Sequence, residues 1–406
     1  MKEENTAEYY LEKASECLEE KLYEDAIGWY DKCLKIDPGN ALGFNNIGYA
    51  LNGLERFEDA ILCFDESLKL DPSNAYTFYN KGYALNKLKR FEEAILCFDD
   101  SLKLNPSNAY AFYHKGCSLN GLGRFEEAIL CFDDSLKLDP SDAYSFSNKG
   151  YALNEIGRFE DAILCFDDSL KLDPSNAYAF YNKGCALIEL NRFEEAILCF
   201  DDSLKLDSSN AYAFRNRGYA LNEVGRFEEA ILCFDDSLKL DPSNAYAFSN
   251  KGYALNEIGR FEEAILCFDD SLKLDPSNAY GFSNKGYAFA HLERYREAAD
   301  LFKISISLVP PHKNVLFNLI FCLFSAQEYK EVISFSDRYL KLVPNDPEVL
   351  RWKGESLFHL NQYRKAGQCF REAKMDILQV IVLLGLESEE NKLITFMLDS
   401  DPFLQR

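Results

Sequence analysis

The sequence has few of the residues and segments on which enzymes and membrane-spanning proteins depend. Its 406 residues include only four histidines, and neither a nucleophile elbow nor a phosphate-binding loop occurs. The most apolar stretch, about Val380 to Leu386, is far shorter than the ~18 to 20 residues that cross a bilayer. The first ten residues, MKEENTAEYY, contain no apolar signal region. We therefore expect a non-catalytic, cytoplasmic protein without a membrane span.

Positive charge is also scarce. The chain has 44 Lys and Arg against 67 Asp and Glu, a net charge of −23, which makes nucleic acid a poor partner. The acidic excess belongs to the repeated unit. Residues 245–278, for example, carry three cations and six carboxylates. We interpret most of these carboxylates as a solvated outer face that keeps the protein soluble. A basic ligand is the alternative, although no residue pattern provides it with a specific binding place.

Cysteine motifs for metal binding are missing, although the chain has 13 cysteines. No CxxC pair and no Cys/His cluster with zinc spacing occurs. Seven cysteines recur at intervals of 34 residues: Cys63, Cys97, Cys131, Cys165, Cys199, Cys233 and Cys267. Packed helices lie about 8 to 10 Å apart, whereas a disulfide requires Cα atoms within about 7 Å. We therefore predict free thiols, no metal site and no cofactor.

What the sequence does contain is a 34-residue unit, as in residues 245–278, AYAFSNKGYALNEIGRFEEAILCFDDSLKLDPSN. A period of this length predicts a stacked repeat protein. Most units share glycine at position 8, alanine at 20, phenylalanine at 24 and proline at 32. The small residues predict close contact of two helices, and the Asp-Pro-Ser-Asn turn ends one helix and caps the next. The units begin at residues 7, 41, 75, 109, 143, 177, 211, 245, 279, 313 and 347.

Each unit predicts two helices with apolar stripes that only stacking on neighbouring units can bury. Between the two helices we expect a left-handed glycine turn at Gly123, Gly157, Gly225 and Gly259. Residues 1–6 form a short extension, and the repeats occupy residues 7–380. After Met375 we expect a helix, a break near residues 385–388 and a second helix to about Leu398. Residues 381–406 are interpreted as helices that cap the stack, or alternatively as a partner-binding segment.

The repeat pattern resembles the tetratricopeptide repeat family over residues 7 to about 375. Two positions depart from that family: position 4, often Trp, is Phe, and position 7, often Leu, is mainly Lys, as in Lys81 and Lys115. The resemblance implies an all-α protein, an α-solenoid in which about eleven helix-turn-helix units form a right-handed superhelix. It also implies that one side of each first helix lines a concave groove that binds protein or peptide partners.

The groove side of the first helix carries asparagine and tyrosine. Positions 2, 5, 6, 9, 12 and 13 share that side by their spacing. Asparagine disfavours helices, but its amide can pair with a peptide backbone, and tyrosine adds contact area at a small entropic cost. The face is similar to the asparagine ladder of O-linked N-acetylglucosamine transferases. We predict that an extended peptide binds Asn46, Asn80, Asn148, Asn182, Asn216, Asn250, Asn284, Tyr83, Tyr151, Tyr219 and Tyr253.

Three alternatives compete with peptide binding. The groove face is neutral if near-identical copies merely inherited it, or the protein is the targeting arm of an enzyme complex. The third alternative is a structural spacer that self-associates as a homo-oligomer through leucines at position 22. Position 22 is rotated by about 200° from the buried position 20, so these leucines are expected to be partly exposed. Packing between adjacent second helices is the preferred interpretation, and a self-association seam is the alternative. They are Leu62, Leu96, Leu130, Leu164, Leu198, Leu232 and Leu266.

Overall fold

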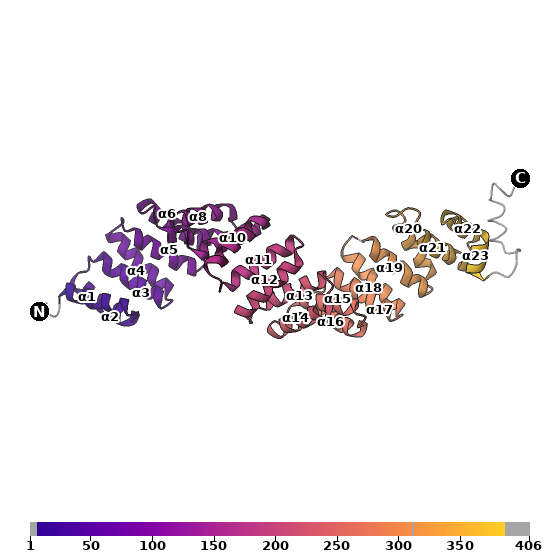
Figure 1. Ribbon diagram of the computed structural model, residues 1–406, viewed down its shortest axis with the longest axis horizontal. Helices are drawn as coiled ribbons and strands as arrows, with labels where there is room; N and C mark the ends of the chain where they lie inside the picture. Colours follow the sequence, from indigo (N-terminus) through magenta and orange to yellow (C-terminus); the bar gives the residue numbers. More distant parts are fainter. Residues whose placement is uncertain (1–5, 311, 386–406) are drawn as a thin grey trace. The chain divides into compact units, whose positions relative to one another are not determined.

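A computed structural model describes residues 6–310 and 312–385, and this part of the chain is all-α, with 23 helices. The helices form two compact units, Met1–Ser208 and Ser209–Arg406 (Figure 1). The first helices of the repeats are α1 (Ala7–Glu19), α3 (Ala41–Gly53), α5 (Ala75–Lys87), α7 (Ala109–Gly121), α9 (Ala143–Glu155), α11 (Ala177–Glu189), α13 (Ala211–Glu223), α15 (Ala245–Glu257), α17 (Ala279–His291), α19 (Lys313–Ser325) and α21 (Pro347–His359). The second helices are α2 (Tyr23–Ile36), α4 (Phe57–Leu70), α6 (Phe91–Leu104), α8 (Phe125–Leu138), α10 (Phe159–Leu172), α12 (Phe193–Leu206), α14 (Phe227–Leu240), α16 (Phe261–Leu274), α18 (Tyr295–Leu308), α20 (Tyr329–Tyr339) and α22 (Tyr363–Glu372), followed by α23 (Ile377–Leu384).

The two helices of a repeat meet at the glycine of position 8. The phenylalanine of position 24 lies on this glycine, and its ring is fully buried from Phe64 to Phe268. A Cβ atom built on Gly150 would stand 2.7 Å from Cε1 of Phe166. The predicted contact between small residues and the facing helix is therefore confirmed, and it leaves no room for a side chain.

The turns follow the predicted chemistry. The side chain of Asn74 caps α5 by accepting hydrogen bonds from the amides of Tyr76 and Thr77. The turn glycines have φ between +72° and +78°, the left-handed region that glycine adopts at little cost. Lys89 and Asn191 adopt the same conformation at the equivalent position, with φ of 58° and 56°.

A buried serine at position 27, which sequence reasoning overlooked, joins the second helix of a repeat to the start of its first helix. Its hydroxyl donates to the backbone carbonyl of the alanine at position 1, as from Ser169 to Ala143 at 2.8 Å. Seven consecutive repeats make this bond, at 2.8 to 3.0 Å. The bond satisfies a hydroxyl that burial would otherwise leave without a partner.

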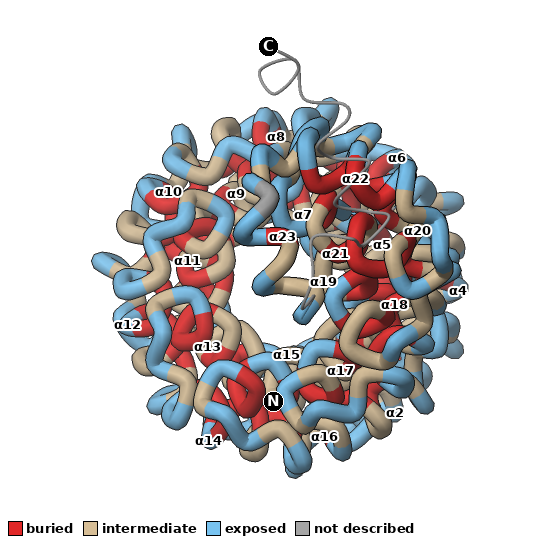
Figure 2. Tube along the Cα trace, turned by 90° about the vertical axis from the view of Figure 1, so that its right-hand side faces the viewer, coloured by how far each residue is buried: buried red, intermediate tan, exposed pale blue. Residues whose placement is uncertain are grey.

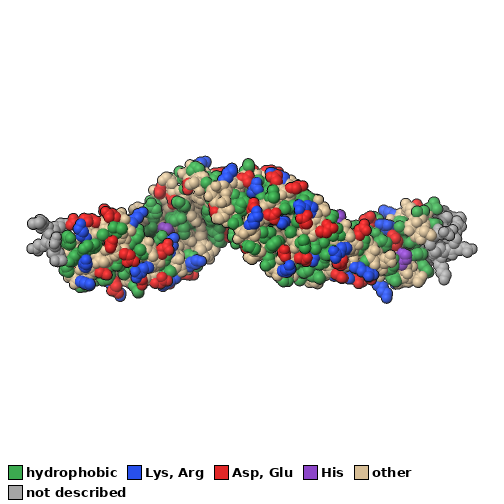
Figure 3. Space-filling model, turned by 90° about the horizontal axis from the view of Figure 1, so that it is seen from below, with side chains coloured by type: hydrophobic (Ala, Val, Ile, Leu, Met, Phe, Trp, Pro, Cys, Tyr) green, Lys and Arg blue, Asp and Glu red, His purple; other side chains and the backbone are tan. Residues whose placement is uncertain are grey.

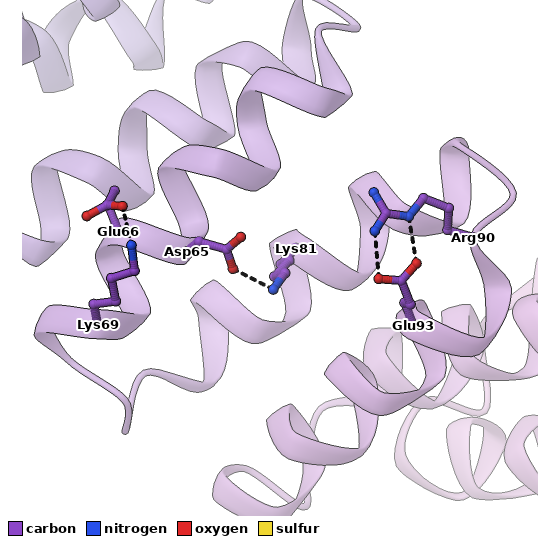
Figure 4. A network of polar contacts seen from close by, with 6 residues as sticks. All are labelled: Asp65, Glu66, Lys69, Lys81, Arg90 and Glu93. Atoms are coloured by element: carbon purple, nitrogen blue, oxygen red, sulfur yellow. Dashed lines mark hydrogen bonds and ion pairs between the residues drawn. The ribbon is translucent and has the colours of Figure 1, made fainter.

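The lysine at position 7, which replaces an apolar residue of the family pattern, forms an ion pair between repeats. Lys81 Nζ lies 2.5 Å from Oδ1 of Asp65 in the preceding second helix (Figure 4). The same pair recurs for Lys115, Lys149, Lys183, Lys251 and Lys285. Pairs this exposed contribute about 0.2 to 1 kcal/mol each. The aspartate at position 25, which we interpreted as part of a solvated outer face, therefore connects neighbouring repeats.

Within each unit the first helices lie on one side and the second helices on the other. Consecutive first helices contact each other, α3 with α5 up to α9 with α11, and α13 with α15 up to α19 with α21. Figure 2 shows α10 and α12 on the outer side of α9 and α11, and α14 and α16 on the outer side of α13 and α15. The first helices therefore line the inner side of the stack in each unit.

The chain beyond the last repeat begins with the expected helix. In α23, Val380 is buried against the cluster that includes Leu357 and Phe370. The helix ends at Gly385, whose φ is 60°. The rest of the predicted C-terminal segment, with its second helix to Leu398, lies outside the described residues.

Candidate functional site

The predicted groove asparagines of position 6 all lie on first helices, with their amide groups partly engaged. Nδ2 of Asn182 donates to the carbonyl of Tyr178 at 2.8 Å, and Nδ2 of Asn250 donates to that of Tyr246 at 2.9 Å. Asn148 Nδ2 makes the equivalent bond to its own helix at 2.9 Å. Asn182 is buried, and its side chain also interacts with the hydroxyl of Tyr178. Asn148 and Asn250 are half-buried, and no described group donates a hydrogen bond to their Oδ1 atoms.

The other position-6 asparagines have different surroundings. Nδ2 of Asn46 donates to the hydroxyl of Tyr30 at 2.9 Å, and Nδ2 of Asn80 donates to Oδ1 of Asn45 at 3.4 Å. Asn216 accepts from the guanidinium of the neighbouring Arg215. Asn284 is half-buried on α17. The copies of one sequence position are thus not equivalent as binding groups.

Tyrosine rings accompany the asparagines along the inner side. Those of position 2 are 45 to 78 % exposed, from Tyr178 to Tyr280. At position 9, Tyr83, Tyr151 and Tyr219 are half-buried and Tyr253 is 36 % exposed. Burial, followed by the nearby Glu155 carboxylate, raises the pKa of the Tyr151 hydroxyl, so this group is a neutral donor at pH 7. The rings offer apolar area with hydroxyl groups at their edges.

Asparagines and tyrosines together line hollows between neighbouring first helices. One hollow of about 220 Å³ lies between α3 and α5, and another of about 420 Å³ lies between α9 and α11. In both, positions 9 and 12 of one repeat face positions 5 and 6 of the next. The lining residues shared by this pattern are Tyr49, Asn52, Tyr79 and Asn80 in the first hollow, and Tyr151, Asn154, Tyr181 and Asn182 in the second.

The position-12 asparagines have a structural task that the sequence did not reveal. Asn154 Nδ2 donates at 3.0 Å to the backbone carbonyl of Asn182, and Asn120 Nδ2 donates at 3.2 Å to that of Asn148. Their Oδ1 atoms are buried and accept no hydrogen bond among the described residues. These amides line the hollows, but their donors already connect one first helix to the next.

His114 replaces the position-6 asparagine in one repeat and forms an aromatic cluster. Burial, and then the charge of Lys87, lower the pKa of its imidazole to about 4, so it is neutral at pH 7. Rings with centroids 4.9 to 6.1 Å from the imidazole are those of Tyr79, Tyr83, Phe98 and Tyr113. At this repeat the groove face is therefore more apolar than elsewhere.

Arg215, at position 5 of its repeat, places a cation on the inner face of α13. Its guanidinium carbon lies 5.1 Å from the ring centre of Tyr212 and 5.4 Å from that of Tyr246. Stacking on two rings orients the guanidinium. This point on the face suits an anionic group better than its neighbours do.

The position-22 leucines are exposed, as their rotation away from position 20 indicates, but the packing expected for them is wrong. We expected them to pack between adjacent second helices, but each of the seven side chains is 62 to 64 % exposed. Second helices of adjacent repeats contact each other less than first helices do, because they lie on the outer side of the stack. The leucines consequently project from the outer face without a cover in the described structure.

Neither a bilayer-crossing helix nor a metal-binding group stands out in the part of the chain that the structure describes. No helix there has the length and apolar character needed to span a membrane. No three His, Cys, Asp or Glu side chains there come together as metal ligands. The repeated cysteines are free, and burial raises the pKa of the Cys97, Cys131 and Cys165 thiols to about 11. Such thiols are poor nucleophiles at neutral pH.

Comparison with known families identifies the class of the protein. Tetratricopeptide repeat models match residues 7–40, 41–74, 75–108, 113–177, 181–245 and 245–278. The chain belongs to the tetratricopeptide repeat family, and its fold is the α-solenoid of that family. Proteins of this family generally mediate protein–protein interactions and are typically non-catalytic scaffolds.

Solved structures resemble parts or all of the chain. The crystal structure of YrrB, described as a TPR protein with an unusual peptide-binding site, is 25% identical, with 46% of this chain and 96% of that chain covered and a TM-score of 0.42. A chain in the crystal structure of the APC/C hetero-tetramer Cut9-Hcn1 is 15% identical to this chain. The match covers 97% of this chain and 96% of that chain, with a TM-score of 0.45. Yeast Tom70 is 15% identical over 98% of each chain, with a TM-score of 0.39. No curated protein matches the chain.

Proposed function

We propose that the chain is a non-catalytic scaffold whose inner, first-helix face binds an extended segment of a partner protein. The observation that supports this proposal most is the repeated pairing of an available asparagine acceptor with exposed tyrosine rings. Asn148 and Asn250 each hold Nδ2 against their own helix and leave Oδ1 unbonded within the described residues. An extended backbone presents N–H groups that such acceptors bind.

The tyrosines supply the apolar part of the proposed contact. Their rings at positions 5 and 9 line the hollows between first helices, where the side chains of a bound segment find room. Because the same groups recur in each repeat, most contacts would be to main chain and not to particular side chains. We therefore expect low sequence selectivity and an affinity that increases with the length of the bound segment.

The test replaces Asn148, Asn182, Asn216 and Asn250 together by Ala. One lost hydrogen bond costs on the order of 1 kcal/mol, or about fivefold in affinity, so four replacements should weaken peptide binding at least tenfold. Partners captured from lysate by the wild type would be identified by mass spectrometry. The affinity of the captured segment, and of shortened versions, would then be measured by calorimetry with both proteins.

A matched control replaces four exposed lysines on the outer side of the repeats, Lys137, Lys171, Lys205 and Lys239, by Ala. Circular dichroism establishes that both variants are folded before binding is compared. The proposal requires that the lysine variant binds like the wild type while the asparagine variant does not. Equal affinities of all three proteins would remove the groove from consideration.

A self-associating spacer is the second candidate, and the exposure of the position-22 leucines favours it. Under this alternative the mass measured by light scattering rises with protein concentration at pH 7. A constant monomer mass over a hundredfold range of concentration would exclude it.

A further inference from the structure

The hollow between α9 and α11, which we call the acidic hollow, differs in size and charge from the one between α3 and α5. In both, a tyrosine of position 9 and an asparagine of position 12 face a tyrosine of position 5 and an asparagine of position 6. Their volumes are about 420 Å³ for the acidic hollow and about 220 Å³ for the other. Two sequence positions, 9 and 13, account for the differences.

The difference in size arises at position 9 of the second of the two helices. Tyr83 occupies this position on α5 and lines the smaller hollow, whereas Cys185 occupies it on α11 and lines the acidic hollow. A thiol takes up much less space than a phenol ring. The acidic hollow therefore has room for a guest side chain where the other hollow holds a ring of the protein itself.

The difference in charge arises at position 13. Glu155 on α9 and Glu189 on α11 both line the acidic hollow, and both are exposed. The corresponding residues on α3 and α5 are Gly53 and Lys87. Each glutamate is the last residue of its helix, where the helix dipole disfavours a carboxylate. Helix stability therefore does not explain the two glutamates.

The two carboxylates have no counter-ion among the described residues. The lining of the acidic hollow includes no Lys or Arg. The arginines that follow the two helices are engaged elsewhere, because Arg158 pairs with Asp161 and Arg192 pairs with Glu195. On the face drawn in Figure 3, by contrast, acidic side chains lie interspersed with basic ones. The acidic hollow is therefore a place of uncompensated negative charge.

The other lining groups also suit a cation that donates hydrogen bonds. The rings of Tyr151, Phe159 and Tyr181 line the acidic hollow, and the faces of such rings attract cations. Oδ1 of Asn154 is buried and accepts no hydrogen bond among the described residues. A buried acceptor without a partner costs free energy, which a donor from a guest would regain.

The smaller hollow shows that a cation fits over a ring at the equivalent place. Nζ of Lys87 lies 5.3 Å from the ring centre of Tyr83 on the same helix. The chain thus supplies its own cation on α5, whereas α11 has a carboxylate and a thiol at the same two positions. Charge complementarity favours a cation from a partner at the acidic hollow.

We propose that the acidic hollow receives an arginine side chain of the segment bound on the inner face. This inference rests on the proposed function, because it names the chemistry of one residue in that segment. A guanidinium is planar and carries five N–H donors, so it can stack on rings while it donates to carboxylates. The arginine sets the register of a segment that the other repeats bind with little selectivity.

The probes are two fluorescent 12-residue peptides of glycine, serine and alanine that differ in one central residue. One peptide carries arginine, and the other carries citrulline, which has the same shape without the charge. Fluorescence anisotropy measures their affinities for the wild type and for the hollow variant Glu155→Gln, Glu189→Gln. The matched control Glu160→Gln, Glu194→Gln removes the same charge from exposed positions on α10 and α12. Circular dichroism confirms that both variants are folded.

We expect the wild type and the control to bind the arginine peptide at least about tenfold more tightly than the citrulline peptide, because charge-assisted hydrogen bonds and ring stacking add to main-chain binding. The hollow variant should lose this preference while its affinity for the citrulline peptide stays the same. A lysine peptide should bind more weakly than the arginine peptide, because an ammonium group cannot stack in this way.

Equal affinities of the wild type for the arginine and citrulline peptides would overturn the inference and leave the proposed function standing. A preference for arginine that persists in the hollow variant would also overturn it, because the arginine would then bind elsewhere. Absence of binding by either peptide would overturn it as well. Failure of the proposed function gives a different result, in which replacement of the four groove asparagines by Ala leaves the affinities for both peptides unchanged.

Discussion

Glycine at position 8 and phenylalanine at position 24 are the residue pair on which each repeat depends. The ring of Phe166 lies so close to the Cα of Gly150 that an added Cβ would stand 2.7 Å from it. Glycine is a poor helix former, and the repeats tolerate it because the helices could not otherwise approach. The identical contact in the neighbouring repeats means that one substitution probes a general feature of the stack.

Replacement of Gly150 by Ala should lower the free energy of unfolding by about 1 to 3 kcal/mol, because the ring must shift in a closely packed place. The control is Gly28→Ala in α2, where an added Cβ would meet no atom within 4 Å. This change should raise stability by up to about 1 kcal/mol through helix propensity alone. Urea denaturation followed by circular dichroism measures both, and equal midpoints for the two variants would contradict the prediction.

At the scale of elements, polar bonds between first helices hold one repeat against the next. The amide of Asn120 on α7 donates to the backbone carbonyl of Asn148 on α9. Lys115 adds an ion pair to Asp99 of the preceding second helix. The first contact is partly buried and needs a donor at one defined place, whereas the second is a surface pair of small effect. The asparagine bond is therefore the more specific connection.

Replacement of Asn120 by Asp should destabilise the protein at pH 7 by about 1 to 3 kcal/mol, because a buried acceptor would then face a carbonyl. Since the folded state favours the protonated acid, which can donate, its pKa would be raised. The penalty should therefore be smaller at pH 4 to 5 than at pH 7. Chemical denaturation at both pH values measures this difference.

The matched control for this substitution is Asn108→Asp. Asn108 caps α7, and Asp142 already fills the same role for α9. A carboxylate at a helix N-terminus is favourable, so this variant should be as stable as the wild type at pH 7. An Asn120→Asp protein of wild-type stability would show that the bond between the helices does not matter.

At the scale of the whole molecule, the net negative charge opposes contact between the exposed leucines of different molecules. The net charge is −23 at pH 7, and the isoelectric point is about 4.7. Hydrogen bonds from the arginines that precede the second helices lower the pKa of Glu93, Glu127 and Glu195 below the usual carboxyl value. Their stabilising contribution is present above the unfolded pKa and is lost only as the pH falls through the lower folded pKa. These pairs therefore persist near pH 4.7.

Acidification from pH 7 to about 4.7 should consequently cause folded molecules to associate. Light scattering should rise as the net charge vanishes, while circular dichroism stays close to its value at pH 7. The variant with Ser at positions 96, 130 and 164 should scatter less, because it lacks three of the exposed position-22 leucines. Loss of helical signal before scattering begins would instead indicate acid unfolding.

Much of the fold follows from the repeat pattern. The period, the glycine and proline positions and the capping asparagines indicated two helices per unit and their left-handed turns, since these features depend on neighbours in sequence. The binding role of the position-6 asparagines stays a prediction. Their unequal surroundings, from Tyr30 beside Asn46 to Arg215 beside Asn216, could not be read from near-identical copies.

The sequence by itself determined where helices begin and end, which faces are apolar and that the repeats stack, because local propensity and periodicity encode these features. Only the tertiary structure decided that Lys81 meets Asp65, that Asn154 connects two helices and that the position-22 leucines remain uncovered. Periodicity places a residue on a helix face, but it does not say how closely the next repeat approaches that face. The first helices come into contact and the second helices spread apart, so equally apolar positions differ in burial.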